Sequence, residues 1–333
     1  MKLLRLLFIF VFTAALFAKE MPTQVSQDQK IQTVLKEAYE KYKPLKEGKN
    51  ADYIKALADV PSDLFGIAIV TADGKVYKIG DSGYKFSIQS ISKVFTAALV
   101  MQEHGAKTLQ EKIGVSATGL PFNSILAIEL EENRPSNPFV NAGAIATTSL
   151  VQAEDSNERW NKIHQNMNNF AGTELKLNKV VYKSELSDNK RNQAIAKLLD
   201  AYGRIYSDPL EATTVYTRQC SINVSAKDLA VMGSTLANDG INPFTHKKVL
   251  EKSYVPKLLS VMATAGLYDG AGDWFYATAL PAKSGVGGGI LVVVPHKMAI
   301  GLFSPRLDKI GNSVRGVKAA EYIIEKLHLN PYE

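Results

Sequence analysis

Apolar runs near both ends of the chain have the length and composition of β-strands. The first run, 64–70, is followed by an Asp-Gly turn and a second run at 76–79, which together predict a β-hairpin. Close to the C-terminus, two further runs occupy residues 289–295 and 298–303. Because strand patterns occur at both ends, we expect one antiparallel sheet assembled from the two ends of the chain.

Helical periodicity fills most of the remaining sequence. Helix-prone segments at 24–43 and 51–58 precede the first strand, and a closing helix is predicted at about 313–327. Between about residues 105 and 259 the pattern is mostly helical, with long loops rich in Asn, Pro and Gly. The pattern therefore predicts an α/β (α+β) fold, in which helices flank the sheet and a helical insert separates its two halves.

The length of 333 residues and a hydrophobic content of 46% suit one large domain. We expect it to cover residues 27–329, with a sheet part at about 27–85 and 270–329 and a helical part at about 90–265. Residues 1–18 differ, because two basic residues precede an apolar run that ends at Ala18. That order is typical of a secretory signal peptide.

The signal peptide predicts a periplasmic or secreted protein. Cleavage after Ala18 would leave residues 19–26 as a linker, whereas a retained segment would act as an anchor. No other apolar run is long enough to span a membrane, so no membrane association is expected after cleavage.

One stretch, residues 86–95, combines a predicted helix start with candidate chemistry. Apolar residues recur with the spacing of a buried helical face, and His104-Gly105 would end the helix. Ser90 would then lie at the helix N-terminus, with Lys93 one turn further along the same face. The apolar positions are Ile91, Val94, Phe95, Ala98 and Leu99.

This spacing suits nucleophilic catalysis. A serine hydroxyl becomes nucleophilic when a base takes its proton, and a desolvated lysine can be that base. Unpaired amides at a helix N-terminus can stabilise an oxyanion. Ser-x-x-Lys occurs three times, but only Ser90 and Lys93 open an apolar helix. The alternatives are that Ser90 only caps the helix and that Lys93 lies at the surface.

Charge and composition exclude several other classes of function. The net charge of +6 comes from 39 basic residues scattered among 33 acidic ones, without the basic stripe of a nucleic-acid-binding protein. The single cysteine, Cys220, excludes an internal disulfide. The five histidines have no metal-ligand spacing, so we expect neither a metal nor a cofactor.

A second motif, Lys283-Ser284-Gly285, precedes the strand predicted at 289–295. A Ser-x-x-Lys helix combined with a late Lys-Ser/Thr-Gly strand is the arrangement of penicillin-recognising serine hydrolases. Gly287-Gly288-Gly289 follows, but no helix comes after it, so close backbone passage explains these glycines better than phosphate binding. A Ser-Asp-Asn triplet, which is a third motif of these hydrolases, occurs at 187–189, although such triplets are common in loops.

From about residue 25 to 329 the sequence resembles the serine-dependent glutaminase family. The resemblance rests on ordered blocks spread over nearly the whole chain, namely 86–95, 137–145, Arg191-Asn192, 220–222, 280–290 and 311–316. It implies a serine β-lactamase-like fold and hydrolysis of L-glutamine to L-glutamate and ammonia. One departure is Asn189-Lys190, where relatives usually have Gly-Asp before Arg-Asn.

The resemblance also implies a role for individual residues. Ser90 would be the acylated nucleophile, Lys93 its activating neighbour and Tyr268 a partner in proton transfer. The backbone amides of Ser90 and Val286 would form the oxyanion hole. The positions that would contact substrate are Tyr53, Gln89, Asn141, Glu185, Asn192 and Tyr216. Family members usually form dimers or tetramers, which implies a homo-oligomer here.

Two other functions remain as alternatives. A β-lactamase or penicillin-binding hydrolase would need a deacylating carboxylate beside the nucleophile, whereas a free amino acid needs a counter-charge for its ammonium group. Glu185 can be that counter-charge, and asparagine and tyrosine side chains can bind the substrate carboxylate. A catalytically silent binding protein on the same fold is disfavoured by the presence of Ser90, Lys93, Tyr268 and Lys283.

Overall fold

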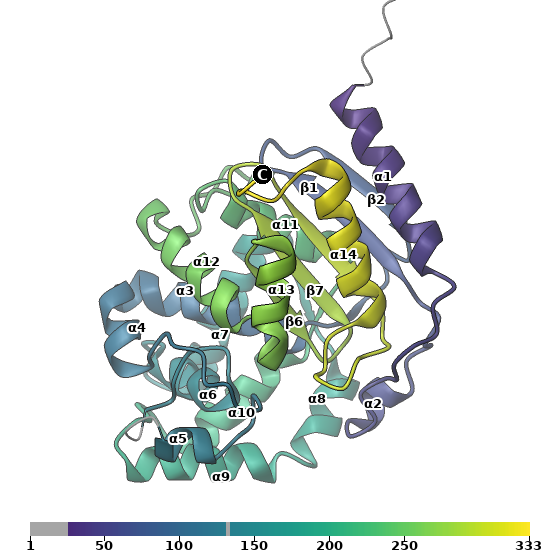
Figure 1. Cartoon of the computed structure of the whole chain (residues 1–333). Coiled ribbons are helices and arrows are strands. Elements are labelled where there is room, and N and C mark those ends of the chain that lie inside the picture. The colour runs from purple at the N-terminus through teal and green to yellow at the C-terminus, as the bar shows by residue number, and fades with distance from the viewer. Residues whose placement is uncertain (1–25, 131–133) are drawn as a thin grey trace, which may run out of the picture.

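The computed structural model describes residues 26–130 and 134–333 of the chain (Figure 1). The predicted signal peptide at 1–18 lies outside the described residues. Within them, no helix has both the length and the apolar composition needed to cross a membrane.

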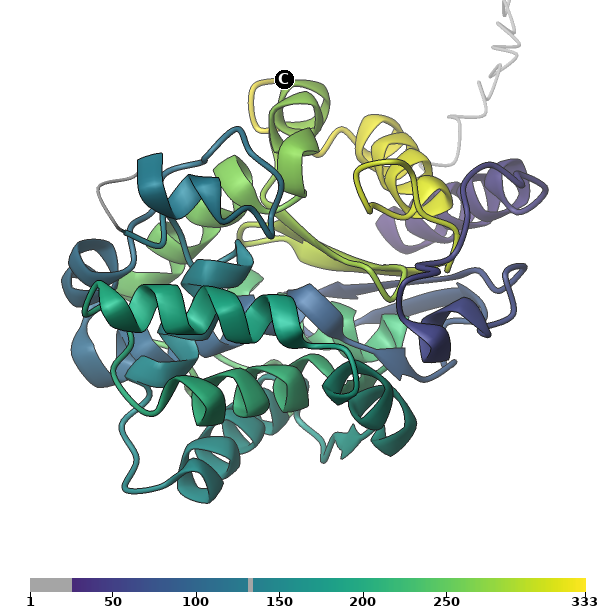
Figure 2. The same cartoon turned by 90° about the horizontal axis from the view of Figure 1, so that it is seen from below.

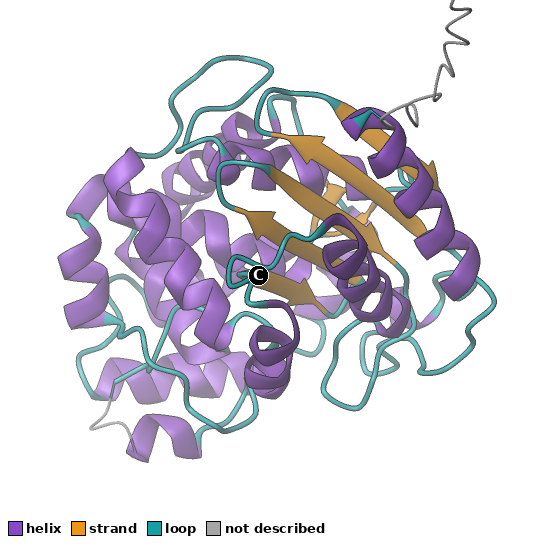
Figure 3. Ribbon diagram, turned by 45° about the horizontal axis from the view of Figure 1, so that its top comes forward, coloured by secondary structure: helices purple, strands orange, loops and turns teal. Residues whose placement is uncertain are grey.

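The central sheet has five antiparallel strands in the order β2-β1-β8-β7-β6. Strand β1 of the N-terminal part pairs directly with β8 near the C-terminus, so that Gly66 lies opposite Phe303. The prediction of one sheet built from both chain ends is confirmed, and Figure 3 shows these strands side by side. Their bounds are Gly66–Thr71 (β1), Val76–Gly80 (β2), Ala282–Gly285 (β6), Gly289–Val294 (β7) and Met298–Phe303 (β8).

Helices cover both faces of this sheet. Helices α1 (Gln27–Tyr42), α13 (Ala271–Thr278) and α14 (Val314–Leu327) pack on one face, around a core that includes Ile67, Ile300 and Ile323. Helix α11 (Ala226–Ala237) packs on the other face together with the helical part, and Figure 2 shows the sheet between these two layers.

The close approach of α11 to the sheet depends on two glycines. A Cβ atom at Gly233 of α11 would lie 2.5 Å from Leu291, and one at Gly301 of β8 would clash with the Ala226 carbonyl. The start of α11 is fixed by a capping box, in which Ser225 and Asp228 bond to each other's backbone amides. The sheet and the helical part therefore share one closely packed core.

The helical part contains a second sheet that the sequence prediction missed. Strands β3 (Phe86–Ser87), β5 (Ile222–Val224) and β4 (Lys176–Leu177) pair antiparallel in the order β3-β5-β4. Strands of two or three residues are too short to show an alternating pattern, and their partners are far apart in sequence. This small sheet adds to the mostly helical pattern that was predicted there, and it holds the segment that leads into Ser90.

The remaining helices agree with the predicted helical pattern, with shifted ends. The helix predicted at 51–58 is only one turn long. The bounds are Lys55–Ala58 (α2), Ser92–His104 (α3), Ala106–Lys112 (α4), Leu126–Leu130 (α5), Asn141–Leu150 (α6), Ser156–Ala171 (α7), Lys179–Leu186 (α8), Lys190–Ala201 (α9), Pro209–Cys220 (α10) and Val255–Ala265 (α12), with 3₁₀ turns at Gln89–Ile91, Lys252–Tyr254 and Tyr268–Gly270.

Candidate active site

Ser90 lies in a sharp turn between β3 and α3. The residue before it, Gln89, has a φ of 51°, in the left-handed region that side chains rarely adopt. Helix α3 begins at Ser92, two residues later than predicted, and its N-cap Ile91 makes no side-chain capping bond. The Ser90 hydroxyl therefore does not cap the helix, which removes the structural alternative for this residue. Strained backbone of this kind is frequent at functional sites.

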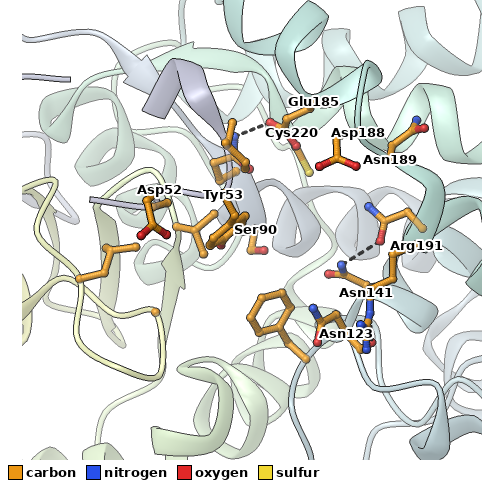
Figure 4. A pocket seen from close by; sticks show the side chains of 18 of the residues that line it. Asp52, Tyr53, Ser90, Asn123, Asn141, Glu185, Asp188, Asn189, Arg191 and Cys220 are labelled. Atoms are coloured by element: carbon orange, nitrogen blue, oxygen red, sulfur yellow. Dashed lines mark hydrogen bonds between the residues drawn. The ribbon is translucent and has the colours of Figure 1, made fainter. Parts of the chain in front are cut away.

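Ser90 opens into a pocket of about 450 Å³ (Figure 4). Figure 4 shows Glu185 and Asn141 on different sides of Ser90, with Tyr53 close to it. The volume is within the usual range for small-molecule sites. Eight of the residues predicted from the sequence line the pocket: Tyr53, Gln89, Ser90, Asn141, Glu185, Asn192, Tyr216 and Val286. The other five, Lys93, Tyr268, Lys283, Ser284 and Gly285, do not line it and are buried.

Lys93 is buried in the protein rather than exposed at the surface. Its Nζ donates to the carbonyl oxygen of Phe139 at 2.9 Å and to Oδ1 of Asn141 at 2.8 Å. In the described part of the chain, no carboxylate forms an ion pair with it. Burial lowers the pKa of Lys93 to about 8, because the charged ammonium loses its hydration. A lysine in this state can release its proton near neutral pH.

The opposite wall of the pocket carries a carboxylate. Glu185 of α8 accepts a 2.6 Å hydrogen bond from Nε2 of Gln89, which also donates to Oγ of Ser87 at 3.1 Å. Burial raises the pKa of Glu185 to about 7, and the bond from Gln89 acts in the opposite direction. Among the described residues, Glu185 carries the only carboxylate that bonds to the turn before Ser90.

An amide network connects Lys93 to the remaining predicted positions. Oδ1 of Asn141 accepts from both Lys93 and the Tyr216 hydroxyl, the latter at 3.2 Å. Nδ2 of Asn141 donates to Oδ1 of Asn192 at 3.0 Å. The three helices α6, α9 and α10 thus hold three neutral polar side chains against one wall.

The Lys-Ser-Gly strand β6 ends beside Ser90. A Cβ atom at Gly285 would lie 2.8 Å from the Ile88 carbonyl and 3.3 Å from the Ser90 amide nitrogen. Gly287 has a similar contact with the Ser87 carbonyl, which supports the prediction of close backbone passage. Val286 follows Gly285 directly and lines the pocket.

Tyr268 lies behind the pocket in a 3₁₀ turn, with a φ of 53°. Its hydroxyl donates to the Ser284 carbonyl at 3.5 Å. Burial raises the pKa of Tyr268, whereas the nearby Ser90 side chain acts to lower it. The phenol is therefore protonated at neutral pH and lies within reach of the Ser90 hydroxyl. Tyr53, by contrast, is at the pocket rim and is 60% exposed.

Several lining residues were assigned no role from the sequence. Asp188 and Asn189 line the pocket, although the Ser-Asp-Asn triplet that contains them was set aside. Arg191 also lines it and donates from Nε to the Asn123 carbonyl at 3.1 Å. Cys220 lines it as a thiol, because burial raises its pKa to about 12. Arg191 and Cys220 lie in the sequence blocks that carry the family resemblance, so the resemblance was the signal that could have identified them as pocket residues.

Across residues 26–130 and 134–333, no group of three or more His, Cys, Asp or Glu side chains is arranged to hold a metal ion. Ser90, the buried Lys93 and Tyr268 are of the residue types that acyl transfer needs as nucleophile, base and proton carrier.

Comparison with known proteins decides the family. A sequence model of the family described as Glutaminase matches residues 48–332. The chain belongs to the glutaminase family. The glutaminase of Colwellia psychrerythraea is 52% identical over 91% of this chain and 98% of its own length. The glutaminase of Mycobacterium ulcerans is 50% identical over 92% and 96%, respectively.

Solved structures of glutaminases have the same fold. One described as the probable glutaminase ybaS has a TM-score of 0.91 and 49% identity, covering 92% of this chain and 100% of its own. A covalent complex of the Bacillus subtilis glutaminase YbgJ with 5-oxo-L-norleucine has a TM-score of 0.83 and 28% identity, covering 90% and 99%. The β-lactamase-like glutaminase fold and the assignment as a glutaminase enzyme, both expected from the sequence, are confirmed.

Proposed function

We propose that this enzyme hydrolyses the side-chain amide of free L-glutamine through an ester on Ser90. The observation that carries the proposal is that Ser90 and Glu185 line one pocket, while Lys93, a buried lysine of low pKa, bonds to the pocket residue Asn141. A free amino acid brings an ammonium and a carboxylate into the site. Glu185 can pair with the ammonium, and Asn192 and Tyr216 can donate to the carboxylate.

The acylation step begins with neutral Lys93. The amine takes the proton of Ser90, directly or through the Tyr268 hydroxyl, and Oγ attacks the amide carbon of the substrate. The resulting oxyanion is held by the amides of Ser90 and Val286. The carbon–nitrogen bond then breaks, and the proton returns to the leaving nitrogen, which departs as ammonia.

The deacylation step uses the same groups in the reverse sense. Lys93, neutral again, takes a proton from a water molecule that attacks the glutamyl ester. The carbon–oxygen bond to Ser90 breaks, the serine regains its proton and L-glutamate leaves. The balance of the two steps is one water consumed and one ammonia released.

Ammonia release tests this proposal. Wild-type enzyme should release ammonia from L-glutamine, while L-asparagine, which is one methylene shorter, and D-glutamine should be poorer substrates. Ser90→Ala should lose the activity by several orders of magnitude. A chromogenic β-lactam serves as the rival substrate. Lactam turnover without glutamine turnover would contradict the proposal, and so would a Ser90→Ala enzyme of nearly normal rate.

We also propose that residues 1–18 direct export and are removed after Ala18, which would put the enzyme in the periplasm or outside the cell. The support is the order of basic residues, apolar run and small residue in this segment. Mass spectrometry of the protein recovered from periplasm and medium tests this. A mature N-terminus at Lys19 would support it, and full-length protein in the cytoplasmic fraction would contradict it.

The assembly is proposed to be a homo-oligomer, either a dimer or a tetramer. Its support is the family resemblance of the sequence. Light scattering of the purified enzyme distinguishes a monomer, whose mass is 36.4 kDa before removal of residues 1–18, from its multiples, and a monomer at assay concentration would contradict the proposal.

A further inference from the structure

The loop between β8 and α14, residues 304–313, forms part of the pocket wall, but the proposed reaction gives it no role. It follows the strand that pairs with both β1 and β7, and it ends at Ser313, which caps α14. A pocket wall built from a loop needs internal bonds to keep its shape. Five consecutive residues of this loop line the pocket: Leu307, Asp308, Lys309, Ile310 and Gly311.

One carboxylate oxygen organises the loop. Oδ1 of Asp308 accepts from the backbone amides of Ile310 and Gly311, both at 2.8 Å. It also accepts from the Asn312 amide at 2.9 Å, and the Asp308 amide donates to the Asn312 carbonyl at 2.8 Å. An aspartate side chain that accepts from amides a few residues further on closes a turn in this way. These bonds fix the backbone of residues 308–312.

The fixed backbone lies against two residues of the proposed reaction. Gly311 has a φ of 109°, a conformation that favours glycine. A Cβ atom there would lie 3.5 Å from the Tyr268 ring and 3.6 Å from the Val286 side chain, which is ordinary van der Waals distance. The Gly311 backbone therefore borders both the proposed proton carrier and the residue whose amide belongs to the proposed oxyanion hole.

Other contacts join the loop to the turn that holds Tyr268. Nδ2 of the buried Asn312 donates at 3.3 Å to the carbonyl of Leu267, the residue before Tyr268. Leu307, near the start of the loop, is in the same buried cluster as Tyr268 and Val286. Tyr268 has a left-handed backbone conformation, which costs free energy and persists only where the surrounding structure holds it. The loop provides part of that support.

We propose that Asp308 is a positioning residue, which holds the 308–312 backbone against Tyr268 and Val286 and so keeps both in place for the attack of Ser90. Misplacement of a reacting group by about 1 Å can lower a rate about 10²-fold. The role belongs to the acceptor oxygen and its reach rather than to the charge, because all three side-chain bonds of Asp308 go to neutral backbone amides. The inference rests on the proposed function, which gives Tyr268 and Val286 their parts.

Measurement of kcat and KM for L-glutamine in Asp308→Ala tests the proposal. This change removes the acceptor, and we expect kcat to fall about 10²-fold. KM should stay within about threefold, because Glu185, Asn192 and Tyr216, which are proposed to bind substrate, lie on helices α8, α9 and α10 rather than in the loop. A wild-type kcat, or a loss confined to KM, would overturn the proposal.

Two conservative variants separate the acceptor from the charge. Asp308→Asn loses the charge but keeps an oxygen at the same place, and asparagine closes the same kind of turn, so its kcat should stay within about threefold of wild type. Asp308→Glu keeps the charge but moves the oxygens one methylene away, so its kcat should fall at least about tenfold. The reverse order, with Asp308→Glu active and Asp308→Asn impaired, would overturn the proposal. This pair also decides the matter if Asp308→Ala does not fold.

Asp155→Ala is the matched control for general destabilisation. Oδ1 of Asp155 accepts from the Glu158 amide at 2.8 Å at the start of α7, a helix that contributes no residue to the pocket lining. Its loss should lower the melting temperature and leave kcat unchanged. If Asp155→Ala lost as much kcat as Asp308→Ala, the loss would reflect destabilisation alone, and the proposal would be wrong.

The wild-type enzyme and Ser90→Ala are assayed in the same series. If wild type released no ammonia from L-glutamine, the proposed function would fail, and the role of Asp308 with it. If wild type is active, Ser90→Ala is inactive and Asp308→Ala keeps full kcat, only the inference about Asp308 is wrong.

Discussion

At the scale of single residues, burial is the main factor that sets the chemistry of this site. It lowers the pKa of Lys93 to about 8 and raises the pKa of Glu185 to about 7, so both titrate near physiological pH. The sequence identified both residues, but only from a motif and a family resemblance. Their burial could not be predicted, because it depends on helices α6, α8 and α10, which come from distant parts of the chain.

The pH dependence of turnover follows from these two groups. Glu185 is protonated and neutral below about pH 7, so KM for L-glutamine should rise as pH falls below that value. Lys93 is protonated below about pH 8, so kcat should fall with decreasing pH from there. Steady-state kinetics between pH 5.5 and 9.5 measure both limbs. In Glu185→Gln the KM limb should vanish, and a KM limb unchanged in that variant would contradict the assignment.

A carboxylate next to Lys93 should shift the pH dependence of kcat to higher pH. In Asn141→Asp, a carboxylate oxygen would replace the amide oxygen 2.8 Å from Nζ of Lys93 and favour the ammonium form. We expect the limb to shift by about 1 to 3 pH units, with strong loss of activity at pH 7.5. Asn192→Asp is the matched control, because Asn192 bonds to Asn141 rather than to Lys93. An equal shift in both variants would refute the role given to Lys93.

At the scale of elements, the site depends on short segments that bring distant residues together. The long strands, the closing helix and the helix after Ser90 were predictable because their hydrophobic periods are regular. The two-residue strand β3 and the turn at Gln89 were not, because neither has a period to read. These short segments orient Ser90, whereas the predictable ones provide the framework.

Close packing of β6 against the Ser90 turn gives a prediction for glycine substitutions. In Gly285→Ala, the added methyl group would press on the Ile88 carbonyl and the Ser90 amide. Because this displaces the proposed oxyanion-hole donor, kcat should fall by about 10²- to 10³-fold. Gly272→Ala is the control, since its Cβ would meet open space within helix α13 and should stabilise the fold by about 0.5–1 kcal/mol. Thermal denaturation and kcat, measured on both variants, check this, and a fully active Gly285→Ala would contradict it.

At the scale of the whole molecule, the sheet part and the helical part share one hydrophobic core, so we expect them to unfold together. The core on the α11 face contains Val70, Leu291 and Phe303 of the sheet together with residues of α3, α7 and α10. The division into two parts was drawn from sequence order alone. Both parts were assigned to one catalytic domain, and helix α11 of the helical part packs directly on the sheet.

The two tryptophans can report whether the parts unfold together. Trp160 lies in α7 of the helical part, and Trp274 lies in α13 on the opposite face of the sheet. Chemical denaturation of Trp160→Phe and Trp274→Phe, followed by the fluorescence of the remaining tryptophan and by circular dichroism, should give one midpoint per variant for both signals. Separate midpoints within a variant would show independent domains.

Covalent trapping tests the central claim, that Ser90 is the acylated nucleophile, most directly. The compound 6-diazo-5-oxo-L-norleucine forms a covalent complex with the Bacillus subtilis glutaminase. Incubation of this enzyme with it, followed by peptide mass spectrometry, should give one adduct on the peptide that contains Ser90 and none in Ser90→Ala. Labelling of Ser90→Ala to the same extent, or an adduct on the pocket thiol of Cys220 instead, would contradict the account.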